Sequence, residues 1–277
     1  MAKDIAVVAI HGMGDTERTY DAKLRSRLRK RIGDSRWARV AWKKVYYQDV
    51  LQANQRRYMR ESLNTADLDW VKLRKFVLFG FSDAAGMESR PHLDNSVYQR
   101  IQQKVLDTLD DAMAALGDPT KPVIFIAHSL GCQVLSNYIW DAQQSQVDAG
   151  VFRQDLPNPI GKTSPEDKFR RLKTLRWLFT SGCNIPIFVA GLPKTKIKPI
   201  VVNARGWRIR WENYFDPDDA LGWPLHPLSP AYEAAVAIDE SINVGGPLNS
   251  WTPMSHTAYW KDDDFLDPVE HALRVML

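Results

Sequence analysis

Hydrophobic residues in this chain form short continuous runs that are separated by longer segments with helical periodicity. Such runs, rich in branched side chains, are typical of strands that are covered on both faces, as in parallel sheets. They predict six strands, at residues 4–10, 40–47, 122–127, 175–181, 206–214 and 235–244. Apolar residues at helical spacing predict helices over residues 19–32, 96–116 and 130–142. Strands that alternate with helices indicate a doubly wound α/β fold with a mostly parallel sheet of about six strands.

Two stretches interrupt this alternation and read as insertions. Residues 51–89 are too long for a simple connection and contain two further helix-like segments, at 51–63 and 68–79. Residues 184–199 combine apolar side chains with prolines and lysines. Long insertions in a compact domain are usually functional lids or mobile loops. We therefore expect one domain over the whole chain, with helical insertions at these two places as a lid or cap.

The composition allows one large core and excludes several classes of protein. The chain has 277 residues, of which 44% are hydrophobic, and a chain of this size buries about three-quarters of its surface on folding. This excludes a disordered chain and a small disulfide-stapled domain. No apolar run approaches the 18 or so residues of a membrane span, and the first residues do not form a signal peptide. Two cysteines without metal or redox spacing favour a cytoplasmic protein with reduced thiols.

The charge balance is mildly positive and does not demand a polyanionic partner. Lys and Arg total 37 against 33 Asp and Glu, which gives a net charge of +4. The basic segment 23–31 can serve an acidic partner, but Leu24, Leu28 and Ile32 recur within it and after it at helical spacing. That pattern is typical of the solvated face of a packed helix. We therefore expect no nucleic-acid partner.

The strongest signal for catalysis is the segment Ala127-His128-Ser129-Leu130-Gly131, which follows a buried strand and precedes a helix. A nucleophile on such a strained turn needs small residues two positions before it and two positions after it. Ala127 and Gly131 meet that need. The turn exposes the Ser129 hydroxyl, and the helix N-terminus favours negative charge that develops there. Ser129 is therefore the predicted nucleophile.

A serine hydroxyl is a poor nucleophile until a base takes its proton. Among the six histidines, His256 lies in the loop after the last predicted strand, from which it can reach the strand ends. The base in turn needs a carboxylate that orients it, and three carboxylates follow the fifth predicted strand. We rank Asp219 first, because the apolar residues after it indicate that the chain turns back into the protein. Asp216 is the alternative acid, and Asp216 and Asp218 can instead be solvated turn residues.

The segment His11-Gly12-Met13-Gly14 directly follows the first predicted strand and supplies candidate donors for an oxyanion. The backbone N–H groups of Met13 and Leu130 can converge on one oxygen of a tetrahedral intermediate, with His11 and Gly12 in the supporting turn. The glycines can also form a simple loop or a phosphate cradle. The dinucleotide pattern is broken by a glutamate at its sixth position, and no G-K-[ST] motif is present. We expect neither a cofactor nor a metal.

These motifs resemble the α/β-hydrolase superfamily, in its esterase and lipase branch. The matching segments occur in the order of that family and span most of the chain: 11–12, 127–131, 216–221 and 255–260. The resemblance implies a Ser129–Asp219–His256 triad, with the oxyanion held by Met13 and Leu130. It implies a serine hydrolase that cleaves a carboxylic ester of a small molecule or lipid through an acyl-enzyme.

Two departures from the family pattern concern the turn and the sheet. Ala127 stands where a glycine is more common, and the chain opens at the family's third strand, which leaves about six strands instead of eight. Two other functions stay open, because one fold hosts many chemistries. One is an acyltransferase with the same triad, and the other is a non-catalytic binding protein on a hydrolase fold.

Overall fold

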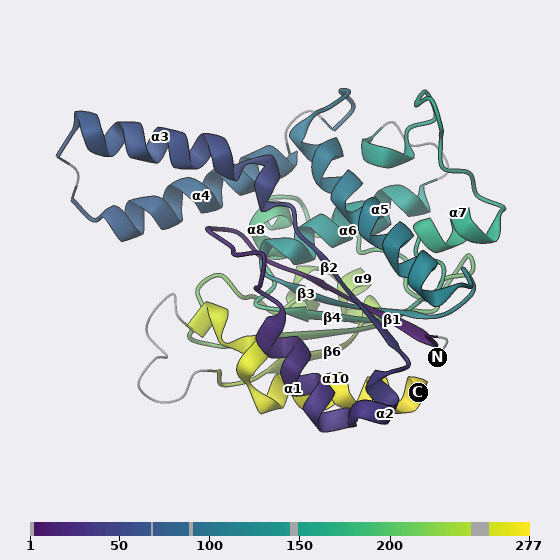
Figure 1. The fold of residues 1–277 in the computed structure, drawn as a ribbon. Coiled ribbons are helices and arrows are strands. Elements are labelled where there is room, and N and C mark those ends of the chain that lie inside the picture. The colour runs from purple at the N-terminus through teal and green to yellow at the C-terminus, as the bar shows by residue number, and fades with distance from the viewer. Residues whose placement is uncertain (1–2, 68, 89–90, 145–148, 245–254) are drawn as a thin grey trace.

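The computed structural model describes residues 3–67, 69–88, 91–144, 149–244 and 255–277. The described strands form one six-stranded sheet in the order β2-β1-β3-β4-β5-β6, and every neighbouring pair is parallel. Helices cover both faces of this sheet (Figure 1), so the predicted doubly wound α/β fold is confirmed. The strands are β1 (Ile5–Ile10), β2 (Val40–Val45), β3 (Val123–His128), β4 (Leu175–Ser181), β5 (Arg210–Phe215) and β6 (Val236–Ser241).

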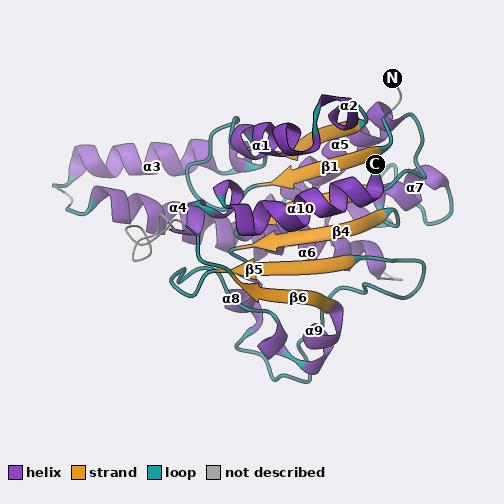
Figure 2. Ribbon diagram, turned by 90° about the horizontal axis from the view of Figure 1, so that it is seen from below, coloured by secondary structure: helices purple, strands orange, loops and turns teal. Residues whose placement is uncertain are grey.

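The strand order reverses next to β1. From β1 the chain crosses to β2 on one side, and it then returns to form β3 on the other side of β1. In open parallel sheets, the loops that follow two such strands diverge, and ligands bind in the gap between them. Because all six strands run in one direction, the segments that follow them meet at one edge of the sheet (Figure 2). The predicted site segments therefore lie at a common edge.

The helices divide between the two faces of the sheet. On one face, α1 and α10 lie side by side (Figures 1 and 2), joined by ion pairs between arginines of α1 and carboxylates of α10. On the other face lie α5, α6 and α7. The helix bounds are α1 (Ala22–Ile32), α2 (Asp34–Trp37), α3 (Gln52–Thr65), α4 (Val71–Glu88), α5 (Val97–Leu116), α6 (Leu130–Gln143), α7 (Pro165–Arg170), α8 (Ile185–Val189), α9 (Pro230–Ala235) and α10 (Asp263–Met276). Single 3₁₀ turns are η1 (Gln48–Val50), η2 (Gly150–Phe152), η3 (His226–Leu228), η4 (Ser255–Thr257) and η5 (Tyr259–Lys261).

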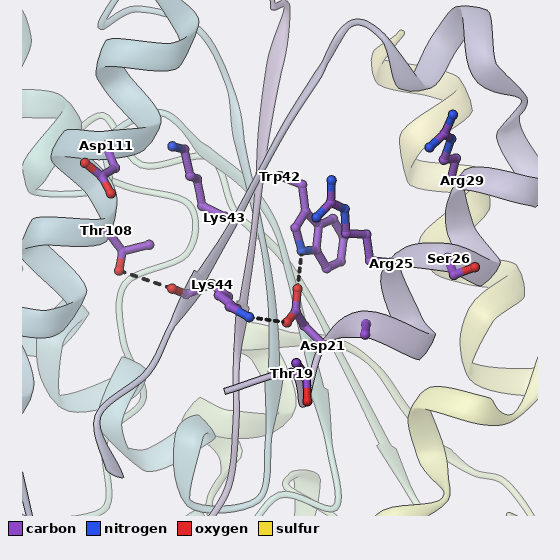
Figure 3. Close-up of a pocket in the computed structure, with 11 residues that line it drawn as sticks. Thr19, Asp21, Arg25, Ser26, Arg29, Trp42, Lys43, Lys44, Thr108 and Asp111 are labelled. Atoms are coloured by element: carbon purple, nitrogen blue, oxygen red, sulfur yellow. Dashed lines mark hydrogen bonds and ion pairs between the residues drawn. The ribbon is translucent and has the colours of Figure 1, made fainter. Parts of the chain in front are cut away.

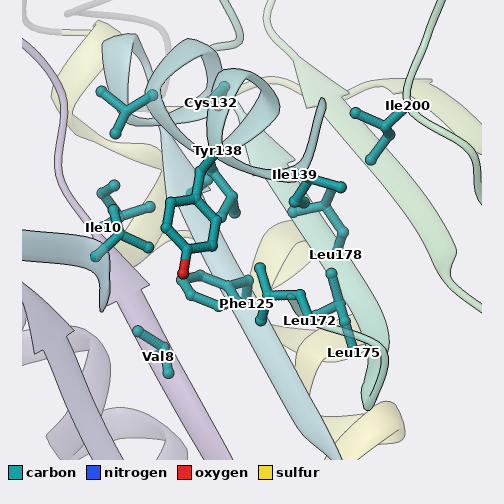
Figure 4. Packing of buried hydrophobic residues seen from close by; sticks show 14 of the residues in the cluster. Val8, Ile10, Phe125, Cys132, Tyr138, Ile139, Leu172, Leu175, Leu178 and Ile200 are labelled. Atoms are coloured by element: carbon teal, nitrogen blue, oxygen red, sulfur yellow. The ribbon is translucent and has the colours of Figure 1, made fainter. Parts of the chain in front are cut away.

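Side chains from alternate positions of the strands feed two apolar clusters, one on each face. In β1, Val8 and Ile10 belong to the cluster with α5 and α6, whereas Ile5 and Val7 belong to the cluster with α1 and α10. This division follows from the period of two in a strand. Figure 4 shows the first cluster, where Tyr138 of α6 packs over β1 and β3. Burial on both faces explains why these strands appear in the sequence as continuous apolar runs.

Several observed bounds differ from the predicted ones. The first helix begins at Ala22, not at residue 19, because a turn precedes it. The strand predicted from residue 206 begins at Arg210, since Gly206 has a φ of 89° that ends extended structure. The second helix of the 51–89 insertion extends to Glu88, beyond the predicted residue 79. Gly80 does not break this helix, and a Cβ at that position would lie 2.8 Å from the Met13 sulfur.

The insertion at residues 51–89 forms a helical hairpin of α3 and α4 that projects beyond the carboxyl ends of the strands (Figures 1 and 2). Large apolar side chains are exposed along it: Tyr58, Leu63, Trp70, Val71, Val77 and Phe81. Within the described part of the chain, no helix combines the length and the hydrophobicity that crossing a bilayer requires.

Candidate active site

Ser129 lies on a sharp turn between β3 and α6. Its backbone has φ 54° and ψ −126°, a conformation that is strained for a residue with a side chain. The Ser129 N–H donates to the Ser181 carbonyl of the neighbouring strand at 3.0 Å, which holds the turn in register. The N–H of Leu130 is the first of α6, so it belongs to the group that lacks partners within the helix. A hydroxyl and a free donor therefore meet at one helix N-terminus.

The structure brings Ser129, His256 and Asp219 into one chain of hydrogen bonds. His256 Nε2 lies 2.7 Å from Ser129 Oγ, and His256 Nδ1 lies 2.7 Å from Asp219 Oδ2. All three residues are buried, with 1%, 6% and 5% of their surfaces exposed, respectively. This geometry fits a neutral imidazole whose Nδ1–H donates to the carboxylate while Nε2 accepts from the hydroxyl.

The three carboxylates after β5 have different partners. Asp216 accepts hydrogen bonds from the backbone N–H groups of Asp218 and Val244, so its oxygens stabilise the turn itself. Asp218 is exposed. Only Asp219 reaches His256, and its other oxygen accepts from the Leu221 N–H at 3.0 Å. Asp219, which we rank first because apolar residues follow it, is therefore the carboxylate that contacts the His256 imidazole.

Tyr259 is a further member of this network that the sequence did not reveal. Its hydroxyl donates to Asp219 Oδ2 at 2.9 Å and accepts from the Asp216 N–H at 2.8 Å. The side chain is fully buried, and it comes from η5, three residues after His256. The spacing of three residues was the only available signal, because it places two side chains on one face of a helical turn.

Electrostatics favour a charged Asp219. Burial disfavours its carboxylate, but hydrogen bonds from His256, Leu221 and Tyr259, together with the positive charge of the imidazole when it is protonated, outweigh that cost and lower its pKa below the ordinary value. Burial, together with the adjacent Asp219 charge, raises the pKa of Tyr259. Tyr259 therefore remains a neutral donor at every physiological pH, and the acid remains ionised.

The glycine turn after β1 packs directly against the strained turn after β3. A Cβ on Gly12 would lie 2.5 Å from Ser129 Cβ, and a Cβ on Gly131 would lie 2.4 Å from the His11 carbonyl oxygen. Only glycine at both positions permits this approach. The contact brings the turn that carries Met13 beside the hydroxyl, which is where donors for an oxyanion are needed.

His11 stabilises this turn as a neutral side chain. Its Nδ1 lies 2.7 Å from the Gly12 carbonyl oxygen, and its Nε2 accepts from the Tyr47 N–H at 3.3 Å. The ring also stacks on the Tyr47 ring at 4.1 Å. Burial lowers the pKa of His11 to about 4, against a smaller opposing effect of the Gly12 hydrogen bond. His11 thus supports the turn and does not act on Ser129.

His128 is likewise held uncharged beside the triad. Burial and the neighbouring His256 lower its pKa to about 3, and its ring centre lies 4.8 Å from that of His256. Its Nδ1 lies 3.1 Å from the Ser181 carbonyl oxygen. The remaining histidines lie elsewhere: His92 and His271 are exposed, and His226 bonds to the Val236 carbonyl.

The glycine turn is tied to the α3–α4 hairpin. The Gly14 N–H donates to Asp83 Oδ2 at 3.1 Å, and Gln48 and Gln55 donate to the same carboxylate. Asp83 is fully buried, and this burial raises its pKa. Asp15, the next residue of the turn, pairs with Arg56, Lys75 and Gln52 of the hairpin. Asp83 was not among the predicted site residues, although a single carboxylate in the largely apolar stretch 76–86 is a signal of a buried partner.

A pocket of about 200 Å³ opens at Ser129 and His256. Its walls come from the turn after β1, from α1 and from η4 and η5, and they include Met13, Tyr20 and Trp260. Neither the hairpin nor the stretch 184–199, both expected as a lid, lines this pocket in the described residues. The described hairpin residues instead contact the glycine turn.

A larger pocket of about 570 Å³ lies beside β2, between α1 and α5 (Figure 3). None of the predicted site residues lines it. Within it, Trp42 Nε1 and Lys44 Nζ both donate to Asp21. The smaller pocket, which contains the hydroxyl, the imidazole and the strained turn, is therefore the better candidate for chemistry.

Among the described residues, no group of three or more His, Cys, Asp or Glu side chains is arranged to hold a metal ion. No protein-family model matches this chain. A comparison with curated proteins also gives no match.

Proposed function

We propose that this protein is a serine hydrolase that cleaves carboxylic esters of small molecules or lipids through an acyl-enzyme on Ser129, in the manner of the α/β-hydrolase superfamily. The observation that supports this most strongly is the continuous chain of two 2.7 Å contacts from Ser129 through His256 to Asp219. It lies at the carboxyl edge of a parallel sheet, on a turn with the backbone of a strained nucleophile.

In the proposed first half-reaction, Ser129 Oγ attacks the ester carbonyl carbon while His256 Nε2 takes the hydroxyl proton. The carbonyl oxygen becomes an oxyanion, and the N–H groups of Met13 and Leu130 stabilise it. His256 then gives its proton to the leaving alkoxide as the carbon–oxygen bond breaks, and the acyl group remains on Ser129. Asp219 holds the imidazole in the Nδ1–H tautomer and stabilises the imidazolium.

In the second half-reaction, His256 takes a proton from water, and the hydroxide attacks the acyl carbonyl. Collapse of the second tetrahedral intermediate releases a carboxylic acid, and His256 returns the proton to Ser129. Neither half-reaction calls for a cofactor or metal. Transfer of the acyl group to an alcohol differs only in the acceptor, and product analysis in the presence of alcohols distinguishes the two reactions.

Two further expectations belong to this proposal. We infer a cytoplasmic location from the two free, buried thiols of Cys132 and Cys183, because such thiols are typical of reducing compartments. We assign the α3–α4 hairpin as a cap element that positions the glycine turn, since Asp83 and Asp15 connect the two.

The test is the Ser129→Ala variant with a fluorophosphonate probe and 4-nitrophenyl acetate. We expect the wild type to be labelled and the variant to remain unlabelled, with kcat lowered by about 10⁴ or more. Ser26→Ala, on the exposed face of α1, is the matched control and should behave as the wild type. Equal labelling of wild type and Ser129→Ala would remove Ser129 from the mechanism.

A further inference from the structure

The pocket at Ser129 has an uneven charge distribution. Two lysines line it, Lys23 from α1 and Lys261 from η5, and no carboxylate side chain does. The lining histidines His11 and His128 are uncharged, because burial lowers their pKa to about 4 and about 3. The lining therefore contains two ammonium groups and no carboxylate that would neutralise them.

Several cations near the pocket are already paired with carboxylates. On α1, Arg27 and Arg31 are neutralised by carboxylates of α10, and Arg29 pairs with Asp34 at 2.7 Å. Within the described residues, neither Lys23 nor Lys261 forms an ion pair. Arg25 and Lys30 of α1 also form no ion pair among the described residues, but they do not line the pocket. Lys23 and Lys261 are therefore the unpaired cations that a ligand in the pocket can reach.

The space between these lysines and the nucleophile is bounded by aromatic rings. Tyr20 and Trp260 line the pocket, and their ring centres lie 5.9 Å apart. The Tyr20 hydroxyl is engaged with the carbonyls of Ala9 and Val45, so the ring is held in place. An apolar engineered cavity of about 150 Å³ binds benzene, so a pocket of about 200 Å³ accommodates a group of roughly that size.

We infer that the preferred ester carries an anionic group, a carboxylate or a phosphate, joined to the ester by an apolar segment about the size of a benzene ring. The apolar segment occupies the space beside Tyr20 and Trp260, and the anion binds Lys23 and Lys261. Both lysines are exposed, so each contact has the modest strength of a charge pair at a surface. This inference rests on the proposed ester hydrolysis and adds its substrate class.

The experiment compares matched esters that differ only in the anion. One pair is 4-nitrophenyl hexanoate and the half-ester mono-4-nitrophenyl adipate, which places the anion on the acyl side. The other is phenyl acetate and 4-acetoxybenzoate, which places it on the leaving group. We expect kcat/KM to favour the anionic member of at least one pair by roughly tenfold, in keeping with two partly exposed charge contacts.

The decisive variant is the double substitution Lys23→Glu/Lys261→Glu. It should lower the ratio of kcat/KM for the anionic ester to that for the neutral ester by roughly 100-fold, because two attractions become repulsions. Lys30→Glu is the matched control, an exposed lysine of α1 outside the pocket, and should leave the ratio as in the wild type. Added salt should reduce the wild-type preference.

The outcomes separate the two proposals. A wild type that cleaves both esters with a ratio near one, unmoved by the double variant, overturns the anionic preference and leaves ester hydrolysis standing. A wild type that cleaves no ester and does not react with a fluorophosphonate overturns ester hydrolysis itself.

Vesicles distinguish two sources of the anion. Fatty acid release from phosphatidate but not from diacylglycerol, abolished in the double variant, identifies a lipid headgroup. A preference confined to the soluble pairs identifies a free small molecule.

Discussion

The two halves of the candidate site are held by different parts of the chain. The half that contains His256 and Asp219 is anchored to the sheet, through Tyr259 and the turn after β5. The half that contains Met13 is anchored to the hairpin, through Asp83 and Asp15. Each half also contains one buried, neutral histidine: His128 in the first half and His11 in the second.

The core of the domain therefore positions one half of the candidate site, and an insertion positions the other. The anchors of the triad half are buried and belong to the segments that follow β5 and β6. The anchors of the other half belong to a hairpin that projects from the body and exposes much of its apolar surface (Figure 1). Local unfolding is easiest where few buried contacts hold an element. The half with His256 and Asp219, the triad half, should therefore be the more rigid one. The half with Met13, named the oxyanion half after its proposed role, should be the more adjustable one.

The largest expected effect lies in the triad half, at Asp219→Asn. Both Asp219 oxygens accept hydrogen bonds, one from the Leu221 N–H and the other from His256 and Tyr259. An amide NH₂ group in either position would face one of these donors. The Nδ1–H tautomer of His256 would then lose its support. We expect kcat for 4-nitrophenyl acetate to fall by about 10⁴, as such a change does in other triads.

Asp216→Asn is the matched control for that substitution. Its oxygens bond only to backbone N–H groups among the described contacts, so we expect a loss of about 1–2 kcal/mol in the free energy of unfolding and a small change in kcat. Equal losses of kcat in the two variants would exclude Asp219 as the orienting acid.

The next effect concerns the two neutral histidines and the pH dependence of stability. In the folded protein His11 and His128 have pKa values of about 4 and about 3, whereas in the unfolded chain both have the ordinary 6.5. Below pH 6.5 the unfolded state binds protons that the folded state does not, so stability falls as the pH falls towards 4.

Between pH 7 and pH 5 each histidine should cost about 2 kcal/mol in the free energy of unfolding, measured with urea. His11→Asn and His128→Asn should each remove about half of this pH dependence, one from each half of the site. A pH dependence that neither variant reduces would show that both rings titrate normally.

The smallest of these effects lies in the oxyanion half, at Asp83→Ala. The substitution removes the acceptor of the Gly14 N–H and of two glutamine amides, which leaves buried donors without partners and loosens the turn. We expect kcat to fall about tenfold with little change in KM, and the free energy of unfolding to fall by about 1–3 kcal/mol.

Asp67→Ala, an exposed residue of the same hairpin, should change none of these quantities. A loss of stability with an unchanged kcat would make Asp83 a structural residue only.

The sheet and the nucleophilic turn were predictable because their signals are local. Strands buried on both faces must be continuous apolar runs, and β1 shows this at every position. A strained turn needs small neighbours, and Ala127 and Gly131 were visible as such. The choice among the three acids after β5 was not local in this sense. It depended on which carboxylate accepts a hydrogen bond from the backbone N–H of Val244, and in the fold that carboxylate is Asp216.

The strands, the helices that alternate with them and the residue types of the candidate site could be read from the residues alone, since they follow from short-range periodicity and turn sterics. The contact of Asp219 with His256, its support by Tyr259 and the link from Asp83 to the glycine turn are properties of the folded chain. These contacts join residues that lie dozens of positions apart in the sequence, and one of them distinguishes Asp219 from the neighbouring carboxylates. Such pairings arise from the order of the strands and the packing of the loops that follow them, which no local pattern encodes.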